Sequence, residues 1–232
     1  MKRELIVTED GSHSIFVPEL NEHYHSTHGA VQESMHVFIE AGLKPILTRK
    51  REINVLEVGL GTGLNAALSL LVSDEFKAKI NYVGVEAYPL SLSEGSQLNF
   101  HEITGGNKMR ETIMKIHSNN RKYPFYLGEN FILNYLEAKL EDVGFPNDSF
   151  DLVYFDAFAP DVQPELWSKE IFEKLYQSMK FEGYLLTYSA KGEVRRNMKE
   201  VGFEIEKLPG VGGKREMTRA FKKIADFHHH EH

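Results

Sequence analysis

A glycine-rich turn between two apolar segments is the sharpest chemical signal in this sequence. The segment Glu57–Gly63 (EVGLGTG) overlaps the end of an apolar run over 53–58 and precedes a helical pattern over 64–71. Glycines at such a turn permit a tight strand-to-helix connection and let a ligand lie against the backbone. The third glycine comes one residue earlier than in the dinucleotide fingerprint G-x-G-x-x-G. The turn therefore favours a nucleoside with a small charged tail over a pyrophosphate.

Two acidic residues end other apolar segments of strand length. Glu86 follows the segment 82–85, where a carboxylate can accept the ribose hydroxyls of an adenosine. Asp156 follows the segment 150–155 and precedes Ala157-Phe158-Ala159-Pro160. Ligands of open parallel sheets bind beyond the carboxyl ends of the strands, so we expect Asp156 to share a crevice with Gly61 and Glu86. The alternatives are a solvated Glu at a strand end and an Asp that caps a turn.

Other reactive residue types lack the context that their chemistry needs. His23, His25 and His28 resemble part of a dinuclear metal motif, but Thr27 stands where that motif requires an Asp, so no metal site is predicted. Ser189 lacks the G-x-S-x-G elbow of a serine hydrolase. The absence of cysteine excludes disulfides, thiolate metal sites and a Cys nucleophile, and it fits a cytoplasmic protein.

Length and composition predict one soluble α/β domain with an N-terminal extension. The 232 residues are 41% hydrophobic and 26% charged, and no apolar run approaches the roughly 20 residues of a membrane span. No signal peptide is recognised at the start of the chain. We expect a β-rich and helical extension over 1–50, the domain over 51–223, and a His-rich tail over 224–232 that resembles an affinity tag.

Alternating patterns of strand and helix define the expected fold. It is a doubly wound, mostly parallel sheet with an antiparallel edge strand, in which the helix near 31–41 lies over the ligand edge. The expected strands are 53–58, 82–85, 123–127 paired with 131–136, 150–155, 184–188, and 203–208 paired with 216–221. The expected helices are 31–41, 64–71, one whose first turn holds Pro89, 164–179 and 193–201.

Charge is distributed unevenly along the chain. The net charge is −7, yet residues 190–223 hold ten Lys and Arg against five Asp and Glu, which leaves residues 1–189 strongly acidic. A basic segment on an acidic body indicates a local site for a polyanion, although solvated helix faces produce similar runs.

Several of these segments together resemble one family. They are EVGLGTGLN (57–65), VGVEAYPL (83–90), FDAFAP (155–160), PELW (164–167), TYSA (187–190), VRR (194–196) and GKREM (213–217). Between about Tyr24 and Ala220 the chain resembles the methyltransferase domain of the bifunctional tRNA 5-methylaminomethyl-2-thiouridine synthesis protein. The resemblance implies a class I fold that uses S-adenosylmethionine to methylate 5-aminomethyl-uridine, with or without a 2-thio group, at the wobble position.

The resemblance also implies roles for individual residues. Asp156 and Phe158 would lie beside the transferred methyl group and the incoming amine. Glu137 would approach the adenine, although the family usually has Gly-Asp where this chain has Leu136-Glu137-Ala138. The cofactor-binding set would be Glu57, Gly59, Gly61, Thr62, Gly63, Asn65, Glu86, Glu137 and Asp156.

The implied partner is the tRNA anticodon loop, where an unpaired base can be splayed into a pocket. Cations of the basic segment would contact its phosphates, namely Lys191, Arg195, Arg196, Lys214 and Arg215. The chain has no room for the family's flavin-dependent oxidase domain, so a separate oxidase would supply the aminomethyl substrate. Two alternatives stay open: a methyltransferase for a small-molecule or protein amine, and a non-catalytic S-adenosylmethionine-binding module. The early third glycine disfavours an NAD-dependent oxidoreductase.

Overall fold

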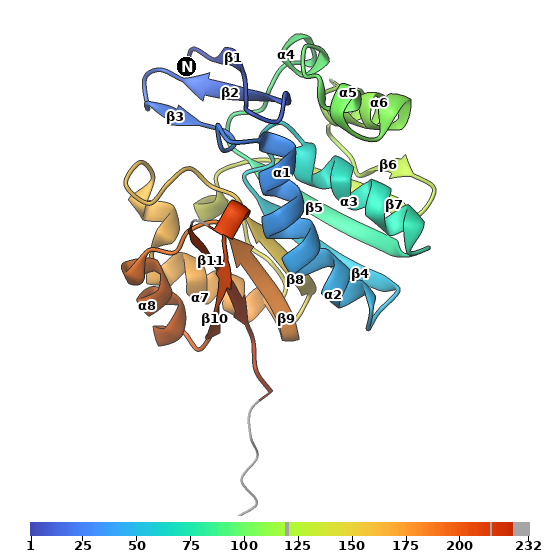
Figure 1. Cartoon of the computed structure of the whole chain (residues 1–232). Helices are drawn as coiled ribbons and strands as arrows, with labels where there is room; N and C mark the ends of the chain where they lie inside the picture. Colours follow the sequence, from blue (N-terminus) through green and yellow to red (C-terminus); the bar gives the residue numbers. More distant parts are fainter. Residues whose placement is uncertain (119–120, 214, 225–232) are drawn as a thin grey trace, which may run out of the picture.

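An eight-stranded sheet in the order β10-β11-β9-β8-β4-β5-β7-β6 crosses the molecule in the computed structural model, which describes residues 1–118, 121–213 and 215–224 (Figure 1). Five neighbouring strands are parallel: β9 (Met179–Thr187), β8 (Phe150–Phe155), β4 (Glu52–Val58), β5 (Lys79–Glu86) and β7 (Phe131–Glu137). The antiparallel strands at the two sides are β6 (Phe125–Gly128), β11 (Glu216–Phe221) and β10 (Glu204–Pro209). The predicted doubly wound sheet with an antiparallel edge is confirmed.

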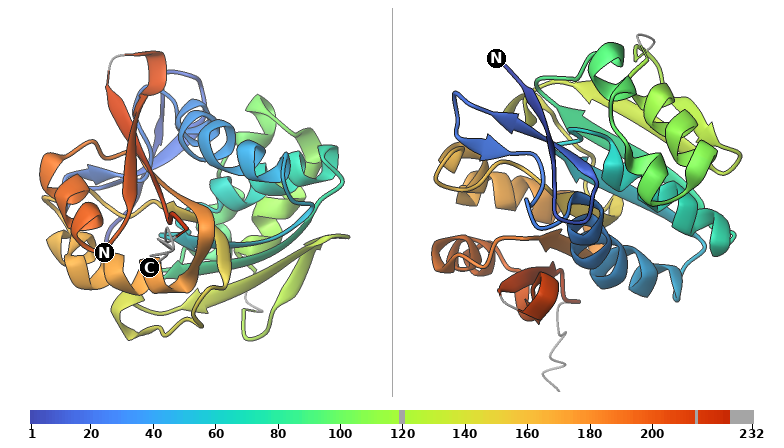
Figure 2. Two further views of the ribbon diagram at one scale, coloured as in Figure 1. Left: turned by 90° about the horizontal axis from the view of Figure 1, so that it is seen from below. Right: turned by 45° about the horizontal axis from the view of Figure 1, so that its top comes forward.

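Helices cover both faces of this sheet, as its buried strands require. All six residues of β8 are buried, so its apolar run packs on both sides. One core joins the sheet to a continuous helix, formed by α1 (Ala30–Ser34), η1 (Met35–Leu43) and α2 (Lys44–Leu47), and to α3 (Leu64–Glu75) and α6 (Gly106–Ile116). The other core joins it to α7 (Lys169–Ser178) and α8 (Gly192–Glu200). Figure 2 shows the helix of residues 30–47 beside α3 in both views.

A second, three-stranded antiparallel sheet lies near one end of the main sheet, at the top of Figure 1. Its strands are β1 (Glu4–Val7), β2 (His13–Val17) and β3 (Glu22–His23). The remaining short helices are α4 (Leu92–Ser96), α5 (Phe100–Ile103), η2 (Leu140–Asp142), η3 (Pro164–Trp167) and η4 (Val211–Gly213). Among the described residues, none of the helices has the length and apolarity that a membrane crossing requires.

The first helix differs from its prediction in position. It covers 30–47 and packs on the face of the sheet, because Gly42 brings its backbone directly against Leu186 and Leu152. The chain segment that faces the carboxyl ends of the strands is 21–28, which precedes this helix. The prediction that the helix covers the ligand edge therefore holds only for its first turn, where Glu33 lines the cavity, and not for the rest of the helix.

Two other helix boundaries also differ from prediction. The expected helix 164–179 breaks at Ser168, whose hydroxyl accepts a hydrogen bond from Ile171 N and caps α7. Pro89 precedes α4 instead of lying in its first turn, because Ser91 and Glu94 form a capping box that starts the helix at Leu92. The His-rich residues 225–232 lie outside the described residues.

Candidate active site

A cavity of about 590 Å³ lies beyond the carboxyl ends of β4, β5 and β8. Its walls come from the segments 58–62, 85–88, 138–141 and 156–159, and residues 21–28 of the N-terminal segment line it as well. Its volume lies within the range of small-molecule and cofactor sites. This is the position at which open α/β sheets bind ligands, because the loops that follow several parallel strands meet there.

Backbone conformation at the turn after β4 requires glycine at two positions that line the cavity. Gly59 has φ of 84°, and a Cβ there would collide with the backbone oxygen of Asp156. Gly61 has φ of 52°, and its Cβ would lie 3.2 Å from Cδ2 of Tyr24. Gly63 was predicted to line the ligand, but it faces Ile116 of α6, 3.1 Å from where its Cβ would lie. The absence of a side chain at Gly63 therefore serves helix packing, and its position gives no support to the predicted ligand contact.

Two buried histidines hold Thr62, the other polar residue of this turn. His25 Nε2 lies 2.9 Å from Thr62 Oγ1, and His117 Nε2 donates to the Thr62 carbonyl oxygen at 2.7 Å. Burial lowers the pKa of each histidine to about 4, so both rings are neutral near pH 7. The sequence drew attention to His25 only through metal spacing. Across the described residues, no group of three or more His, Cys, Asp and Glu side chains is placed to hold a metal ion.

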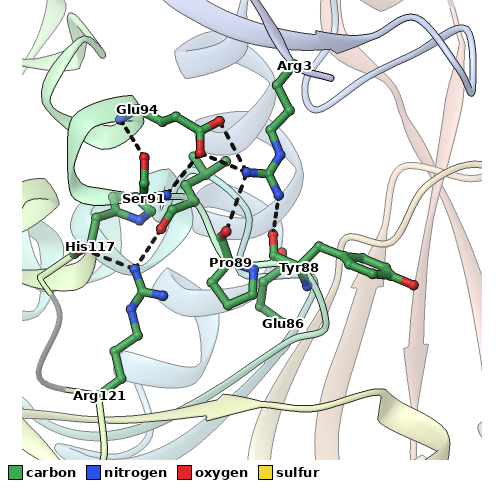
Figure 3. Close-up of polar contacts among 9 residues, drawn as sticks. Arg3, Glu86, Tyr88, Pro89, Ser91, Glu94, His117 and Arg121 are labelled. Atoms are coloured by element: carbon green, nitrogen blue, oxygen red, sulfur yellow. Dashed lines mark hydrogen bonds and ion pairs between the residues drawn. The ribbon is translucent and has the colours of Figure 1, made fainter. Parts of the chain in front are cut away.

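Glu86 joins the glycine turn to the loop that follows β5. Its Oε1 accepts from Gly61 N at 2.7 Å and its Oε2 from Tyr88 N at 3.1 Å. Burial raises the pKa of Glu86. Figure 3 shows how Arg3 holds the same loop, with Nη2 donating to the Tyr88 carbonyl at 2.9 Å and Nη1 donating to Glu94 at 2.9 Å. Arg3, the residue before β1, thus fixes the loop that follows Glu86.

A chain of hydrogen bonds runs from the core to the Asp156 carboxyl group. Tyr82 OH donates to Glu57 Oε1 at 2.6 Å. Asn65 Nδ2 donates to Glu57 Oε2 at 2.8 Å and to Asp156 Oδ2 at 3.0 Å. Burial raises the pKa of both carboxyl groups well above the usual values. Glu57 is fully buried and does not line the cavity, so its position does not support the predicted cofactor contact, and its carboxyl group accepts from Asn65 instead.

Phe158 and Tyr24 form an aromatic wall of the cavity. Their rings meet edge to face, with centroids 5.4 Å apart. The backbone of Phe158 is fixed on both sides, since its N–H donates to Gln163 Oε1 at 3.2 Å and its carbonyl accepts from Trp167 Nε1 at 2.9 Å. The sequence predicted Phe158 for this site but not Tyr24, because Tyr24 comes from the N-terminal segment.

Glu137 does not reach the cavity. It is exposed at the end of β7, in register with Glu86, and the cavity wall beyond it comes from residues 138–141. The prediction that Glu137 contacts a bound adenine is therefore not supported by its position. Glu137 is the last residue of β7, and the chain lines the cavity only from residue 138 onward.

The five predicted phosphate-binding cations have different surroundings. Arg195 is buried, and its guanidinium donates to Thr218 Oγ1 at 2.9 Å, Glu216 Oε2 at 2.8 Å and the Met217 carbonyl at 3.1 Å. This group joins α8 to β11, so the position of Arg195 does not support the predicted phosphate contact. Arg215 is exposed and lines the cavity.

The other three predicted phosphate-binding cations are Lys191, Arg196 and Lys214. Lys191 pairs with Asp161, which is mostly exposed. Arg196 is exposed on α8. Lys214 lies outside the described residues.

Comparisons with known proteins agree on one class of enzyme. A family model described as S-adenosyl-L-methionine-dependent methyltransferase matches residues 107–223. The tRNA 5-methylaminomethyl-2-thiouridine biosynthesis bifunctional protein MnmC of Cupriavidus metallidurans is 29% identical over 229 residues, which cover 94% of this chain and 33% of that protein. The MnmC protein of Pseudomonas syringae is 26% identical over 211 residues, which cover 87% of this chain and 32% of that protein. The chain thus spans about a third of the length of these curated relatives.

Solved structures give the same picture of the fold. The crystal structure of MNMC2 from Aquifex aeolicus superposes with a TM-score of 0.80 at 26% identity, covering 97% of this chain and 71% of that one. Spermidine synthase from Thermotoga maritima has a TM-score of 0.55 at 13% identity, covering 97% of this chain and 73% of that one, and shares the fold.

Proposed function

The chain belongs to the S-adenosyl-L-methionine-dependent methyltransferases, and from this premise we propose that it methylates the amine of a 5-aminomethyl-uridine, with or without a 2-thio group, at the tRNA wobble position. The observation that carries the proposal is the shared cavity of Gly61, Glu86 and Asp156, closed by an aromatic wall. Its substrate follows from the names of the relatives that cover most of this chain.

The residues of the cavity fit S-adenosylmethionine, which supplies an electrophilic methyl group on a sulfonium. Gly61 lines the cavity without a side chain, so its backbone can lie against a ligand. Each carboxylate oxygen of Glu86 accepts one hydrogen bond from a backbone amide and has a further lone pair that can accept from a ribose hydroxyl. Asn65 lines the cavity with a buried Oδ1 that has no partner among the described residues. We propose Gly59, Gly61, Thr62, Asn65 and Glu86 as the cofactor-binding residues.

Asp156 and Phe158 would serve the reacting amine. A free alkylamine is mostly protonated near pH 7, whereas the attacking nitrogen needs its lone pair. Burial raises the pKa of Asp156, which makes its carboxylate a better proton acceptor than an exposed Asp. The backbone of Phe158 is fixed and its ring contacts Tyr24, so the two rings would exclude water and hold the uracil ring of the substrate. Alignment of this kind lowers a barrier by roughly 7–11 kcal/mol at its upper limit.

The tRNA would approach the side of the cavity that Arg215 lines. Arg215 and Arg196 are exposed, and Lys191 has only an exposed ion pair to give up. These three would contact the phosphates on either side of the wobble base, which a single-stranded loop can release into the cavity at low cost. We further propose that residues 1–50 complete the site of the 51–223 domain, that the protein acts in the cytoplasm, and that a separate flavin-dependent oxidase supplies its substrate.

Mass spectrometry of tRNA nucleosides tests this function. Transfer RNA from a strain that lacks this protein is incubated with the protein and S-adenosylmethionine, then digested and analysed. We expect conversion of 5-aminomethyl-uridine, thiolated or not, to its methylaminomethyl form, and no conversion with the Asp156→Asn variant. Methylation of small amines or of a protein, with tRNA nucleosides unchanged, would contradict the proposed substrate. Binding of the cofactor without any turnover would indicate a non-catalytic module.

A further inference from the structure

Six acidic residues line the cavity, and three of them, Glu33, Glu86 and Asp156, accept hydrogen bonds from neutral groups only among the described residues. Glu86 accepts from two backbone amides, Asp156 from the side chain of Asn65, and Glu33 from the backbone of Ser26. Buried carboxylates are costly unless a cation compensates them. The charge of Arg3 compensates Glu86 in part, so positive charge on a ligand is favoured mainly beside the other two carboxyl groups. The proposed role of Glu86 leaves Glu33 and Asp156 to be explained.

Glu33 comes from the first turn of α1, whereas Asp156 comes from the end of β8. Ser26 N donates to Glu33 Oε1 at 3.2 Å, and the second carboxyl oxygen has no hydrogen-bond partner among the described residues. Burial raises the pKa of Glu33. After burial, the charge of Glu33 is the largest influence that raises the pKa of Asp156. Both carboxyl groups line the same cavity, so negative charges on the two would repel each other there.

A third acceptor belongs to the same group. Asn65 is only 2% exposed, and both hydrogens of its Nδ2 are used by Glu57 and Asp156. Its Oδ1 is left without a donor in the described part of the chain, although Asn65 lines the cavity. An unpaired buried acceptor is unfavourable, so a ligand that donates a hydrogen bond to it is bound more tightly. A primary alkylammonium carries three N–H donors, one for each of these acceptors.

We propose that Glu33 and Asp156, with Asn65 Oδ1, form the subsite that receives the ammonium group of the substrate, and that Glu33 selects a cationic primary amine. This assignment rests on the proposed function. The substrate enters as R–NH₃⁺ and gives one proton to the carboxylate pair. The neutral nitrogen then attacks the methyl carbon while the bond from that carbon to sulfur breaks. The product leaves as a secondary ammonium.

The test compares two cofactor analogues that differ in charge at the reacting centre. Sinefungin carries an amine where the cofactor carries its methylated sulfur, and S-adenosylhomocysteine carries a neutral sulfur. Calorimetry gives the affinity of each for the wild type and for Glu33→Gln, whose amide oxygen can still accept from Ser26. The preference is the ratio of the affinity for sinefungin to the affinity for S-adenosylhomocysteine. We expect this ratio to fall about tenfold or more in Glu33→Gln, as for a lost hydrogen bond to a charged group. The affinity for S-adenosylhomocysteine itself should change little.

Two further variants control the comparison. Glu165→Gln removes an exposed carboxylate from the lining of the same cavity and should keep the wild-type preference. Glu33→Asp retains the charge and should keep most of the preference even if the fold is less stable. An unchanged preference in Glu33→Gln would overturn the proposal, and so would an equal loss in Glu33→Asp.

The analogue measurement separates this inference from the proposed function. It needs no tRNA, so a loss of preference in Glu33→Gln supports the cationic subsite even if no tRNA nucleoside is methylated. If the wild type methylates tRNA, Glu33→Gln should lower single-turnover methyl transfer at least tenfold while affinity for S-adenosylhomocysteine stays within twofold. Wild-type transfer rates in Glu33→Gln would overturn the role of Glu33 and leave the proposed function intact.

Discussion

The contact of Arg3 with the loop after β5 yields a prediction that links the N-terminal segment to cofactor affinity (Figure 3). In Arg3→Met the apolar stem is kept and the guanidinium is lost. The variant loses the ion pair to Glu94, the bond to the Tyr88 carbonyl at 2.9 Å and a longer bond to the Pro89 carbonyl at 3.4 Å. Tyr88 N donates to Glu86, so freeing this loop loosens the proposed ribose acceptor.

The exposure of the partners sets the expected magnitude. The Arg3 side chain is 14% exposed and that of Glu94 is 34% exposed, so solvent screens the ion pair in part. Surface pairs contribute about 0–1 kcal/mol and a hydrogen bond from a charged group about 1.5–3 kcal/mol, so we expect a loss of about 2 kcal/mol in the free energy of unfolding. The loss of cofactor affinity cannot exceed the free energy that holds the loop. We expect the affinity for the cofactor to fall about tenfold, or about 1.4 kcal/mol, because binding must then reorder the loop.

Urea unfolding and calorimetry with S-adenosylhomocysteine measure the two effects. Lys2→Met is the matched control, since it removes the same charge at the neighbouring residue. The Lys2 side chain is 75% exposed and pairs with Glu4 on the surface. We expect Lys2→Met to behave as the wild type in both assays. If Arg3→Met binds S-adenosylhomocysteine as tightly as Lys2→Met does, the loop keeps its position without Arg3, and the reasoning is wrong.

Three other predictions concern the reacting centre, the glycine turn and the RNA surface. Asp156→Asn should lower kcat far more than it lowers cofactor affinity, and a wild-type rate in single-turnover assays would exclude proton transfer to Asp156. Burial lowers the pKa of His117 to about 4, against about 6.5 in an unfolded chain, so the unfolded state takes up the proton first as the pH falls. Native stability is therefore lost between about pH 6.5 and 4, and urea unfolding of His117→Gln should show about 1 kcal/mol less loss than the wild type between about pH 7 and 5.5. Replacing Arg196 and Arg215 together by Gln should flatten the salt dependence of tRNA binding by about two charges in a filter-binding titration. The Lys79→Gln variant, at the opposite end of β5 from the cavity, should leave that slope unchanged.

The sheet and the centre of the site could be predicted from local patterns. Apolar runs bounded by turns identified β4, β5 and β8, and the antiparallel pair β10–β11 was visible from its two strands around a glycine-rich turn. Glu86 ends a parallel strand, Gly61 and Asp156 follow two others, and the carboxyl ends of such strands share one edge of a sheet. That shared edge brings the three residues to one cavity without any knowledge of side-chain packing.

Residues beside these were misjudged because their neighbours come from distant segments. Arg195 is one of two consecutive arginines on α8, and only the packing of that helix against β11 decides that it is buried while Arg196 is exposed. Gly63 belongs to the glycine pattern, yet it faces α6 and not the cavity. The motif predicted which residue types stand at these positions, but the contacts of each side chain depend on what packs against it.

The amino-acid sequence by itself determined the class of fold, the glycine turn and the acids at the strand ends, since strand and helix periodicity and strand-end position are local properties of a chain. Only the tertiary structure decided how the cavity is closed. His25 meets the turn across 37 residues of sequence and Arg3 meets the Tyr88 loop across 85. Tyr24 and Glu33 enter the cavity from the same N-terminal region. No spacing rule covers such contacts, because they form only when the N-terminal segment packs over the carboxyl edge of a sheet that is built from the rest of the chain.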